Sequence, residues 1–301
     1  MNKQPISGVV PILLTPFDLE GRIDEASIER LVEFSIAAGV HGLGVALGSE
    51  IFKFSEAERG QVISRVIKSV GGRVPVVINS GAAGTDLAVF YSRRAEQLGA
   101  NALMIVPPSF MPASPEQIRE YYGAISASVG IPIMLQDVPQ GPISAALAMR
   151  IAADCPNVKY IKVETVPMPT KVAAMQASAG EMLTVLGGAG GTYFIEEMRR
   201  GSKGTMPFAT QSAAFREVWD RFQSGDEAGS RKTFDAKIMP VNRIAAQDMG
   251  LSYHVHKQFL VRLGVIKTAF VRSPAIRVDA TTQREIDQVL SEFAPDVAEG
   301  D

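Results

Sequence analysis

The feature that most constrains the fold is the alternation of short apolar runs with amphipathic segments along two-thirds of the 301 residues. Eight runs have the length of a strand, and most are nearly continuous in Val, Ile, Leu and Met. They are Gly8–Pro16, Gly42–Gly48, Val74–Ser80, Ala102–Pro107, Ile131–Pro139, Val158–Thr165, Leu183–Gly188 and Gly204–Phe208. Continuous apolar runs are typical of parallel strands that are covered on both faces. An α/β fold with a parallel sheet is therefore expected.

Helical patterns with recognisable starts separate these runs. Ser55 and Glu58 form a capping box, because the hydroxyl and the carboxylate can each satisfy a free backbone N–H. Ser114 precedes a proline at the first helical position, and Thr85 is placed to cap the helix that follows it. The predicted helices are Ile23–Ala38, Glu56–Val70, Asp86–Leu98, Pro115–Val129 and Ala145–Asp154.

Eight strand–helix units in series favour a closed (β/α)8 TIM barrel over a doubly wound open sheet. An open sheet usually carries a glycine-rich phosphate loop after its first strand, whereas here the first turn is Thr15–Asp18. Further helical patterns follow at Ala213–Gln223, Asp226–Ala245, His254–Leu263 and Thr282–Phe293. The first completes the barrel. We therefore expect a catalytic barrel domain over residues 1–225 and a C-terminal three-helix extension, packed on it, over residues 226–301.

Composition argues against several classes of partner. The formal net charge is −2, so the chain lacks the excess of positive charge that binding to nucleic acid or to an anionic membrane requires. No apolar run is long enough to cross a bilayer, and the N-terminus has no stretch of signal-peptide length. Cys155 is the one cysteine, so no disulfide framework is expected. These features predict a cytoplasmic protein.

The sixth run is the most informative, because a lysine interrupts an apolar strand. Side chains alternate along a strand, so Tyr160, Lys162 and Glu164 share one face. In a barrel the apolar face meets the helices, which turns Lys162 inward near the strand end where barrel chemistry occurs. Burial lowers the pKa of an ammonium, and a neutral amine can attack a ketone to form a Schiff base. Two other interpretations of Lys162 remain: it forms a purely structural ion pair with Glu164, or it is exposed at the barrel mouth. Lys159 faces the other way and is expected in solvent.

Other candidates are weaker. His41, His254 and His256 are the only histidines, and their spacing does not suit a metal centre. Gly187–Gly191 ends the seventh run, and without a nearby P-loop lysine we interpret it as a tight turn rather than a phosphate cradle. Its glycines, Gly188 among them, would let a substrate lie close to the backbone. No metal and no cofactor are expected.

Short segments in a specific order and spacing extend from Gly8 to about Phe208. They are Pro11–Phe17, Gly48–Glu50, Phe54–Arg59, Arg73–Val77, Ile131–Leu135 with Val138-Pro139, and Ile161-Lys162. Together they resemble the dihydrodipicolinate synthase/N-acetylneuraminate lyase family of Schiff-base lyases. The resemblance implies that Lys162 forms the imine and that backbone N–H groups around Gly48 and Ser49 bind the carboxylate of a 2-keto acid such as pyruvate. It also implies a homo-oligomer, typically a tetramer or dimer of dimers.

The chain departs from this family at the positions of two tyrosines, two threonines and the arginine that binds a second substrate, so that the three hydroxyls of the family's proton relay are absent. The residues found there are Gln136 for a tyrosine, Leu47 and Gly48 for two threonines, about Ser109 for a tyrosine from a neighbouring subunit, and about Gly141 for the arginine. Ser49 also replaces a glycine. An amide neither gains nor loses a proton near neutral pH, so it cannot replace a phenol relay in kind. These departures argue against the family's synthase reaction.

The chain is more similar to a subgroup that dehydrates 2-keto-3-deoxy sugar acids, typified by L-2-keto-3-deoxyarabonate dehydratase. The shared pieces are Gln136-Asp137, Ser49-Glu50 and Lys162–Thr165. The resemblance implies that Lys162 attacks the C2 ketone, that C3 loses a proton, and that the C4 hydroxyl leaves as water. For the proton transfer we favour Glu164, with assistance from Ser49 or water, although Glu164 could equally be only the counter-ion of Lys162.

Three smaller expectations complete this hypothesis. Gln136 orients a substrate hydroxyl, and Glu50 braces its loop rather than doing chemistry. Pro108, Phe110 and Met111 shape the substrate pocket. The alternatives are an aldolase that releases pyruvate from the same imine, a true 4-hydroxy-tetrahydrodipicolinate synthase, and an inactive keto-acid-binding homologue. Product identity would separate them.

Overall fold

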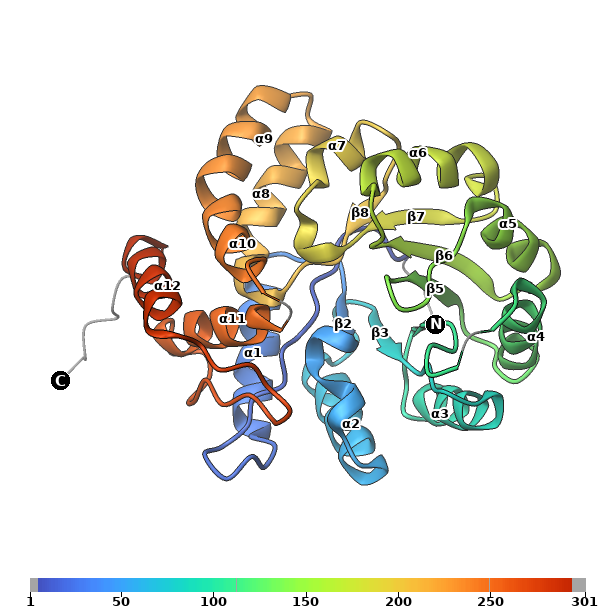
Figure 1. Cartoon of the computed structure of the whole chain (residues 1–301), viewed down its shortest axis with the longest axis horizontal. Helices are drawn as coiled ribbons and strands as arrows, with labels where there is room; N and C mark the ends of the chain where they lie inside the picture. The colour runs from blue at the N-terminus through green and yellow to red at the C-terminus, as the bar shows by residue number, and fades with distance from the viewer. Residues whose placement is uncertain (1–4, 112, 249, 294–301) are drawn as a thin grey trace. The chain divides into compact units, whose positions relative to one another are not determined.

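The computed structural model describes residues 5–111, 113–248 and 250–293. Within them the chain forms an eight-stranded sheet with the order β1-β8-β7-β6-β5-β4-β3-β2, and every strand pairing is parallel. The strands are β1 (Gly8–Val9), β2 (Leu43–Val45), β3 (Val76–Asn79), β4 (Ala102–Ile105), β5 (Ile133–Asp137), β6 (Val158–Val163), β7 (Thr184–Gly187) and β8 (Gly204–Thr205). Each falls inside one of the predicted apolar runs (Figure 1).

Backbone hydrogen bonds join the two ends of this strand order. The N–H of His41 donates to the oxygen of Val9 over 2.9 Å, and the N–H of Gly44 donates to the oxygen of Pro11 over 2.9 Å. The His41 ring adds a third link, because its Nδ1 accepts the N–H of Val9 at 3.1 Å. These bonds connect β1 to the start of β2. The predicted (β/α)8 barrel is confirmed.

A helix follows each strand along the chain. These helices are α1 (Glu25–Ala37), α2 (Glu56–Val70), α3 (Thr85–Gln97), α4 (Pro115–Ser126), α5 (Ala145–Asp154), α6 (Met168–Ala179), α7 (Phe194–Met198) and α8 (Ser212–Gln223). The capping box at Ser55 and the capping residue at Ser114 are confirmed, and Ser114 also forms a capping box with Gln117. The predicted cap at Thr85 is wrong: α3 begins one residue earlier than expected, so Thr85 lies inside the first turn and Gly84 takes the capping position.

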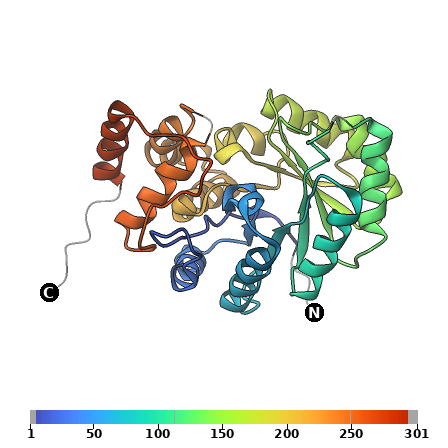
Figure 2. The ribbon, with the colours of Figure 1, turned by 60° about the horizontal axis from the view of Figure 1, so that its bottom comes forward.

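The C-terminal helices are α9 (Glu227–Thr233), the π-helical segment η5 (Phe234–Ile238), α10 (Met239–Ala245), α11 (Leu251–Arg262) and α12 (Ala280–Phe293). The helix predicted over Asp226–Ala245 therefore contains a π turn. Pro240 explains it, because a proline has no N–H for the i−4 hydrogen bond and its ring clashes with the preceding turn. Buried Val241, Val255 and Ile286 belong to one apolar cluster that joins α10, α11 and α12, seen side by side in Figures 1 and 2.

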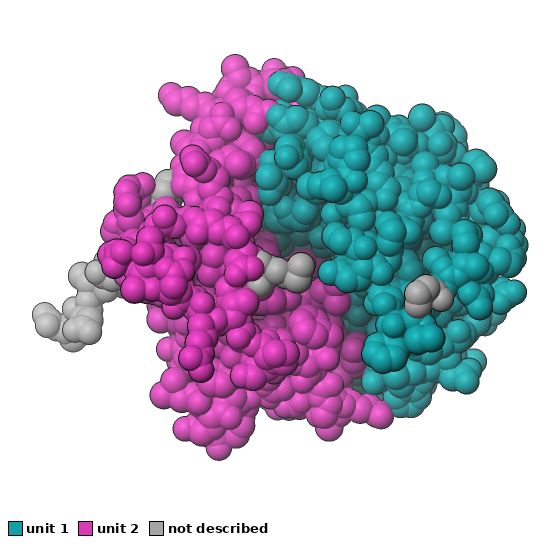
Figure 3. Space-filling view, viewed as in Figure 1, with its two compact units in different colours: residues 1–11, 41–46, 71–207 teal, residues 12–40, 47–70, 208–301 magenta. Residues whose placement is uncertain are grey.

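The residues divide into two compact units, coloured separately in Figure 3. One comprises residues 1–11, 41–46 and 71–207, and contains all eight strands and helices α3 to α7. The other comprises residues 12–40, 47–70 and 208–301, and contains α1, α2 and α8 to α12. The expected domain boundary between residues 225 and 226 stays a prediction. No helix in the described ranges is long and apolar enough to cross a membrane.

Helix α7 places a buried carboxyl group against β7. A Cβ on Gly187 would lie 1.8 Å from Oε2 of Glu197, so only a glycine leaves room for this side chain. Glu197 is fully buried, and neither of its carboxyl oxygens has a hydrogen-bond partner among the described residues. Burial, together with the nearby carboxylates of Glu164 and Glu196, raises the pKa of Glu197 to about 8. Glu197 is therefore a neutral acid near pH 7.

Glu197 should make the protein less stable as the pH rises from about 4.5 to about 8. In this window the folded state keeps the proton and the unfolded state releases it, so the free energy of unfolding falls by up to ~1.4 kcal/mol per pH unit. Glu197→Gln should remove this contribution, as measured by urea unfolding at several pH values. Glu181→Gln, at an exposed position in the same compact unit, is the control and should keep the slope. A wild-type slope in Glu197→Gln would contradict the assignment.

Candidate active site

Lys162 lies on β6, and its side chain is buried. The side chain is 5% exposed, and its Nζ lies 2.9 Å from Oε1 of Glu164. Lys159, three residues earlier on the same strand, is exposed, as the alternation predicted. The ion pair that the sequence left open is thus present. It brings together the two residues that the predicted chemistry requires.

Three donors converge on the Glu164 carboxylate. Besides Lys162, the Gln136 amide donates to Oε2 at 2.9 Å and the backbone N–H of Ala189 donates to Oε1 at 2.9 Å. Burial alone would raise the pKa of Glu164, but the Lys162 charge and the hydrogen bonds from Gln136 and Ala189 outweigh it and lower the pKa. Glu164 is therefore an ionised carboxylate that can accept a proton.

Gln136 links this pair to a residue that the sequence analysis missed. Gln136 pairs in register with Lys162 across β5 and β6, and its side chain is buried. Its Oε1 accepts a hydrogen bond of 3.3 Å from Nδ2 of Asn79, at the end of β3. Asn79 had a usable signal: a polar side chain ends an otherwise apolar strand, at the end of the barrel where active sites lie.

The Gly187–Gly191 segment is a tight turn, as predicted. Ala189, Gly190 and Gly191 all have left-handed backbone conformations, with φ of 49°, 68° and 71°. A Cβ on Gly188 would lie 2.4 Å from Cγ of Glu164 and 2.6 Å from Cε of Lys162. Gly188 is therefore needed for the close approach of these side chains to the turn. Direct contact of Gly188 with a substrate stays a prediction.

Asp137 explains why two motifs of the sequence occur together. Its buried carboxylate accepts the Thr165 hydroxyl at 2.6 Å, the Ile143 N–H at 2.8 Å and the Lys171 ammonium at 2.7 Å. The neighbouring N–H of Glu164 donates to the Asp137 backbone oxygen at 3.0 Å. The ends of β5 and β6 are thereby locked together, which fixes the placement of Gln136-Asp137 against Lys162–Thr165.

Gly48 and Ser49 lie in a 3-10 turn, Leu47–Ser49, of the other compact unit. The buried Ser49 hydroxyl donates to the Leu13 oxygen at 2.5 Å, and the Thr15 hydroxyl donates to the Ser49 oxygen at 2.8 Å. A Cβ on Gly48 would lie 2.8 Å from the ring of Phe208. The turn is therefore tightly anchored. Carboxylate binding by Gly48 and Ser49, and assistance from the Ser49 hydroxyl, stay predictions.

A cavity of about 630 Å³ lies among the segments that follow β4 and β5. Its lining includes the three residues expected to shape the pocket and the two positions where the family has a tyrosine and an arginine: Pro108, Phe110, Met111, Ser109 and Gly141. Phe110 is 84% exposed. A Cβ on Gly141 would approach the Pro107 ring to 3.2 Å, so a longer side chain there would require Pro107 to shift.

The chain is similar to known proteins along almost its entire length. The dihydrodipicolinate synthetase family matches residues 5–293. The chain is 35% identical to a 4-hydroxy-tetrahydrodipicolinate synthase of Sorangium cellulosum (strain So ce56), over 96% of this chain and 97% of that protein. It is 27% identical to an L-2-keto-3-deoxyarabonate dehydratase of Azospirillum brasilense, over 96% of this chain and 94% of that protein.

Solved structures agree as well. The crystal structure of a dihydrodipicolinate synthase from Rhodopseudomonas palustris matches with a TM-score of 0.88 and 26% identity, over 97% of this chain and 99% of that one. With a family match along almost the entire chain and a buried lysine on the sixth barrel strand, the chain belongs to the dihydrodipicolinate synthetase family and is a lyase.

Proposed function

We propose that the chain dehydrates a 2-keto-3-deoxy sugar acid, similar to L-2-keto-3-deoxyarabonate, through a Schiff base on Lys162. The observation that supports this proposal is the pairing of Lys162 with Glu164 while an amide, Gln136, holds the same carboxylate. A carboxylate can accept and return protons, whereas the amide can only orient. Glu164 is thus the group best placed to move protons beside the imine.

Imine formation begins with a proton transfer from the Lys162 ammonium to the Glu164 carboxylate, across their 2.9 Å contact. The neutral amine then attacks the C2 carbonyl carbon, and the C–O double bond becomes a hydroxyl in the carbinolamine. Glu164 returns its proton to that hydroxyl, which leaves as water and forms the iminium. The carboxylate is restored at the end of this sequence.

Dehydration uses the same carboxylate a second time. Glu164 removes a proton from C3, and the electron pair forms the C2–C3 double bond of an enamine. The enamine then expels the C4 hydroxyl as water, with the proton that Glu164 took from C3. Hydrolysis of the resulting iminium frees Lys162. In this proposal Gln136 orients a substrate hydroxyl, Gly48 and Ser49 bind the carboxylate, the Ser49 hydroxyl assists, and the substrate passes close to the Gly188 backbone.

The type of product tests the reaction class. Purified enzyme incubated with a panel of 2-keto-3-deoxy sugar acids should accumulate a keto acid that has lost one water, identified by mass spectrometry. Accumulation of pyruvate would instead indicate retro-aldol cleavage. The synthase reaction is the leading alternative, because the relative with 35% identity is named for it. Robust condensation of pyruvate with aspartate semialdehyde would overturn the proposal, and no turnover of any substrate would favour an inactive keto-acid-binding homologue.

Glu164→Gln tests the proton-transfer role of Glu164. The variant should form the pyruvate adduct more slowly but still reach it at equilibrium, because Lys162 is retained, and it should exchange the C3 protons of the bound pyruvate with deuterated water ~100-fold more slowly or worse. Exchange is followed by proton NMR. Glu120→Gln, at an exposed position on α4, is the control and should exchange at the wild-type rate. If Glu164→Gln exchanged the C3 protons at the wild-type rate, Glu164 would be only the counter-ion of Lys162.

Three further parts of the proposal rest on the resemblance and the composition. They are assembly as a homo-oligomer of tetramer type, a cytoplasmic location, and the division into a catalytic barrel and an extension at residue 225. The oligomer is the part most closely tied to the site, because in the family the position near Ser109 holds the tyrosine that a neighbouring subunit contributes to the site.

A further inference from the structure

Glu50 follows the Leu47–Ser49 turn in a backbone conformation that is unfavourable for it. Its φ and ψ are 59° and 22°, in the left-handed region that residues with a side chain seldom adopt. Its side chain is fully buried. A strained conformation of this kind persists only where the surrounding contacts impose it. The contacts of Glu50 therefore decide the shape of the turn before it.

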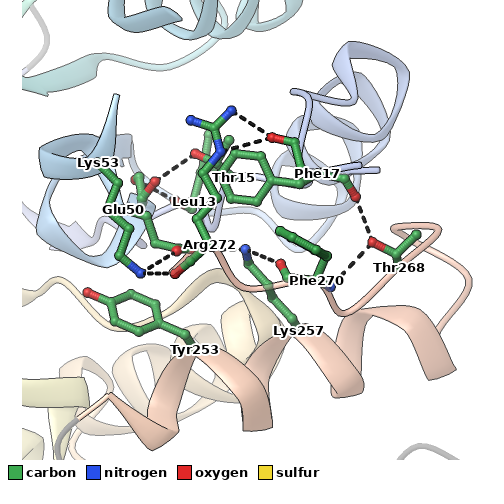
Figure 4. Close-up of polar contacts among 12 residues, drawn as sticks. Leu13, Thr15, Phe17, Glu50, Lys53, Tyr253, Lys257, Thr268, Phe270 and Arg272 are labelled. Carbon is green, nitrogen blue, oxygen red and sulfur yellow. Dashed lines mark hydrogen bonds and ion pairs between the residues drawn. The ribbon is translucent and has the colours of Figure 1, made fainter. Parts of the chain in front are cut away.

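Two lysines hold the Glu50 carboxylate, one at each oxygen (Figure 4). Lys257 Nζ lies 2.5 Å from Oε1, and Lys53 Nζ lies 2.9 Å from Oε2. Lys53 is three residues away along the chain, but Lys257 comes from α11, 207 residues further on. Glu50 thus connects its own turn to the C-terminal extension. The expectation that Glu50 braces its loop agrees with these contacts.

Lys257 is enclosed so completely that it can act only on its neighbours. Its side chain is fully buried, and its ammonium also donates to the Phe270 oxygen at 2.8 Å and lies 4.3 Å from the centre of the Phe17 ring. Burial lowers the pKa of Lys257 to about 8, and the Glu50 carboxylate opposes this shift. A lowered pKa can mark a catalytic amine, but this amine faces protein on every described side.

The same face of α11 holds the beginning of the turn. Tyr253 precedes Lys257 by four residues, so the two side chains are neighbours on the helix surface. The Tyr253 hydroxyl donates to the Leu47 oxygen at 3.0 Å, and the Glu50 N–H donates to that same oxygen at 3.0 Å. One helix face therefore holds the turn at both ends, through Leu47 and through Glu50.

We propose that Lys257 is a positioning residue for keto-acid recognition: together with Tyr253 it fixes Leu47 and Glu50, and so sets the direction of the backbone N–H groups of Gly48 and Ser49. This inference rests on the proposed binding of the substrate carboxylate by that turn. The C-terminal extension thereby takes part in substrate binding through the conformation of one turn, without contacting the substrate itself.

Removal of Lys257 leaves Glu50 paired with Lys53, so the buried carboxylate keeps a counter-ion. Lys257→Met retains a long flexible side chain and should therefore fold. Tyr253→Phe removes a single hydroxyl and is a second variant with little risk to folding. Lys267→Met is the matched control, because Lys267 is 66% exposed on its side chain and belongs to the same compact unit.

The experiment measures the ketone concentration that gives half-maximal borohydride trapping on Lys162. Pyruvate is compared with methyl pyruvate, which has the same ketone but no carboxylate. For pyruvate, this half-maximal concentration should rise about tenfold in Lys257→Met and about threefold in Tyr253→Phe, in line with the loss of aligned hydrogen bonds. Methyl pyruvate should be trapped as in the wild type. Lys257→Arg should recover part of the loss, and Lys267→Met should match the wild type for both ketones.

The outcomes separate this inference from the proposed function. If wild-type protein traps neither ketone, the Schiff-base proposal fails and the inference fails with it. If the wild type is trapped but folded Lys257→Met and Tyr253→Phe keep the wild-type value for pyruvate, only the positioning role is wrong. An equal rise for pyruvate and methyl pyruvate would also contradict it, because a general structural defect does not distinguish a carboxylate from an ester. Should Lys257→Met not fold, the Tyr253→Phe comparison decides alone.

Discussion

The contact between the Lys162 ammonium and the Glu164 carboxylate is the interaction on which the candidate site depends. A buried ion without a partner costs several kcal/mol, so each of these groups requires the other. The pair also needs space, and Gly188 provides it, since a Cβ there would overlap both side chains. The Ala189 N–H and the Gln136 amide then satisfy the remaining acceptor positions of the carboxylate. The Gly187–Gly191 turn and strand β5 thus both hold the Lys162–Glu164 ion pair in place.

The proposed reaction follows from the chemical groups that surround the Lys162–Glu164 pair. A carboxylate with a lowered pKa lies beside the amine, while an amide stands where the family resemblance places a phenol. In the proposed mechanism one residue, Glu164, therefore moves the protons in place of a relay of hydroxyls. The positions near Ser109 and Gly141, where the resemblance places a second tyrosine and an arginine, line a cavity instead. These two differences are the reason that we propose a dehydration rather than a condensation with a second, anchored acid.

Much of this could be predicted from local patterns, and the remainder shows where such patterns end. Strand alternation is a property of neighbouring residues, so it was sufficient to place Lys162 and Glu164 on one face and Lys159 on the other. Helix starts at Ser55 and Ser114 are equally local, whereas the misplaced cap at Thr85 depended on a helix boundary shifted by one residue. The Lys257–Glu50 contact joins positions 207 residues apart, and no periodicity reports such a pairing. Asn79 could be predicted in part: the sequence places it at the end of a strand, but it does not indicate the hydrogen bond with Gln136.

Peptide mapping after borohydride reduction with pyruvate tests directly whether the Lys162 amine condenses with a ketone. We expect one reduced adduct per chain, located on the peptide that contains Lys162, absent from Lys162→Ala and retained in Lys159→Ala. Failure of pyruvate and of every deoxy-keto acid to label the wild-type protein, or full turnover by Lys162→Ala, would contradict it.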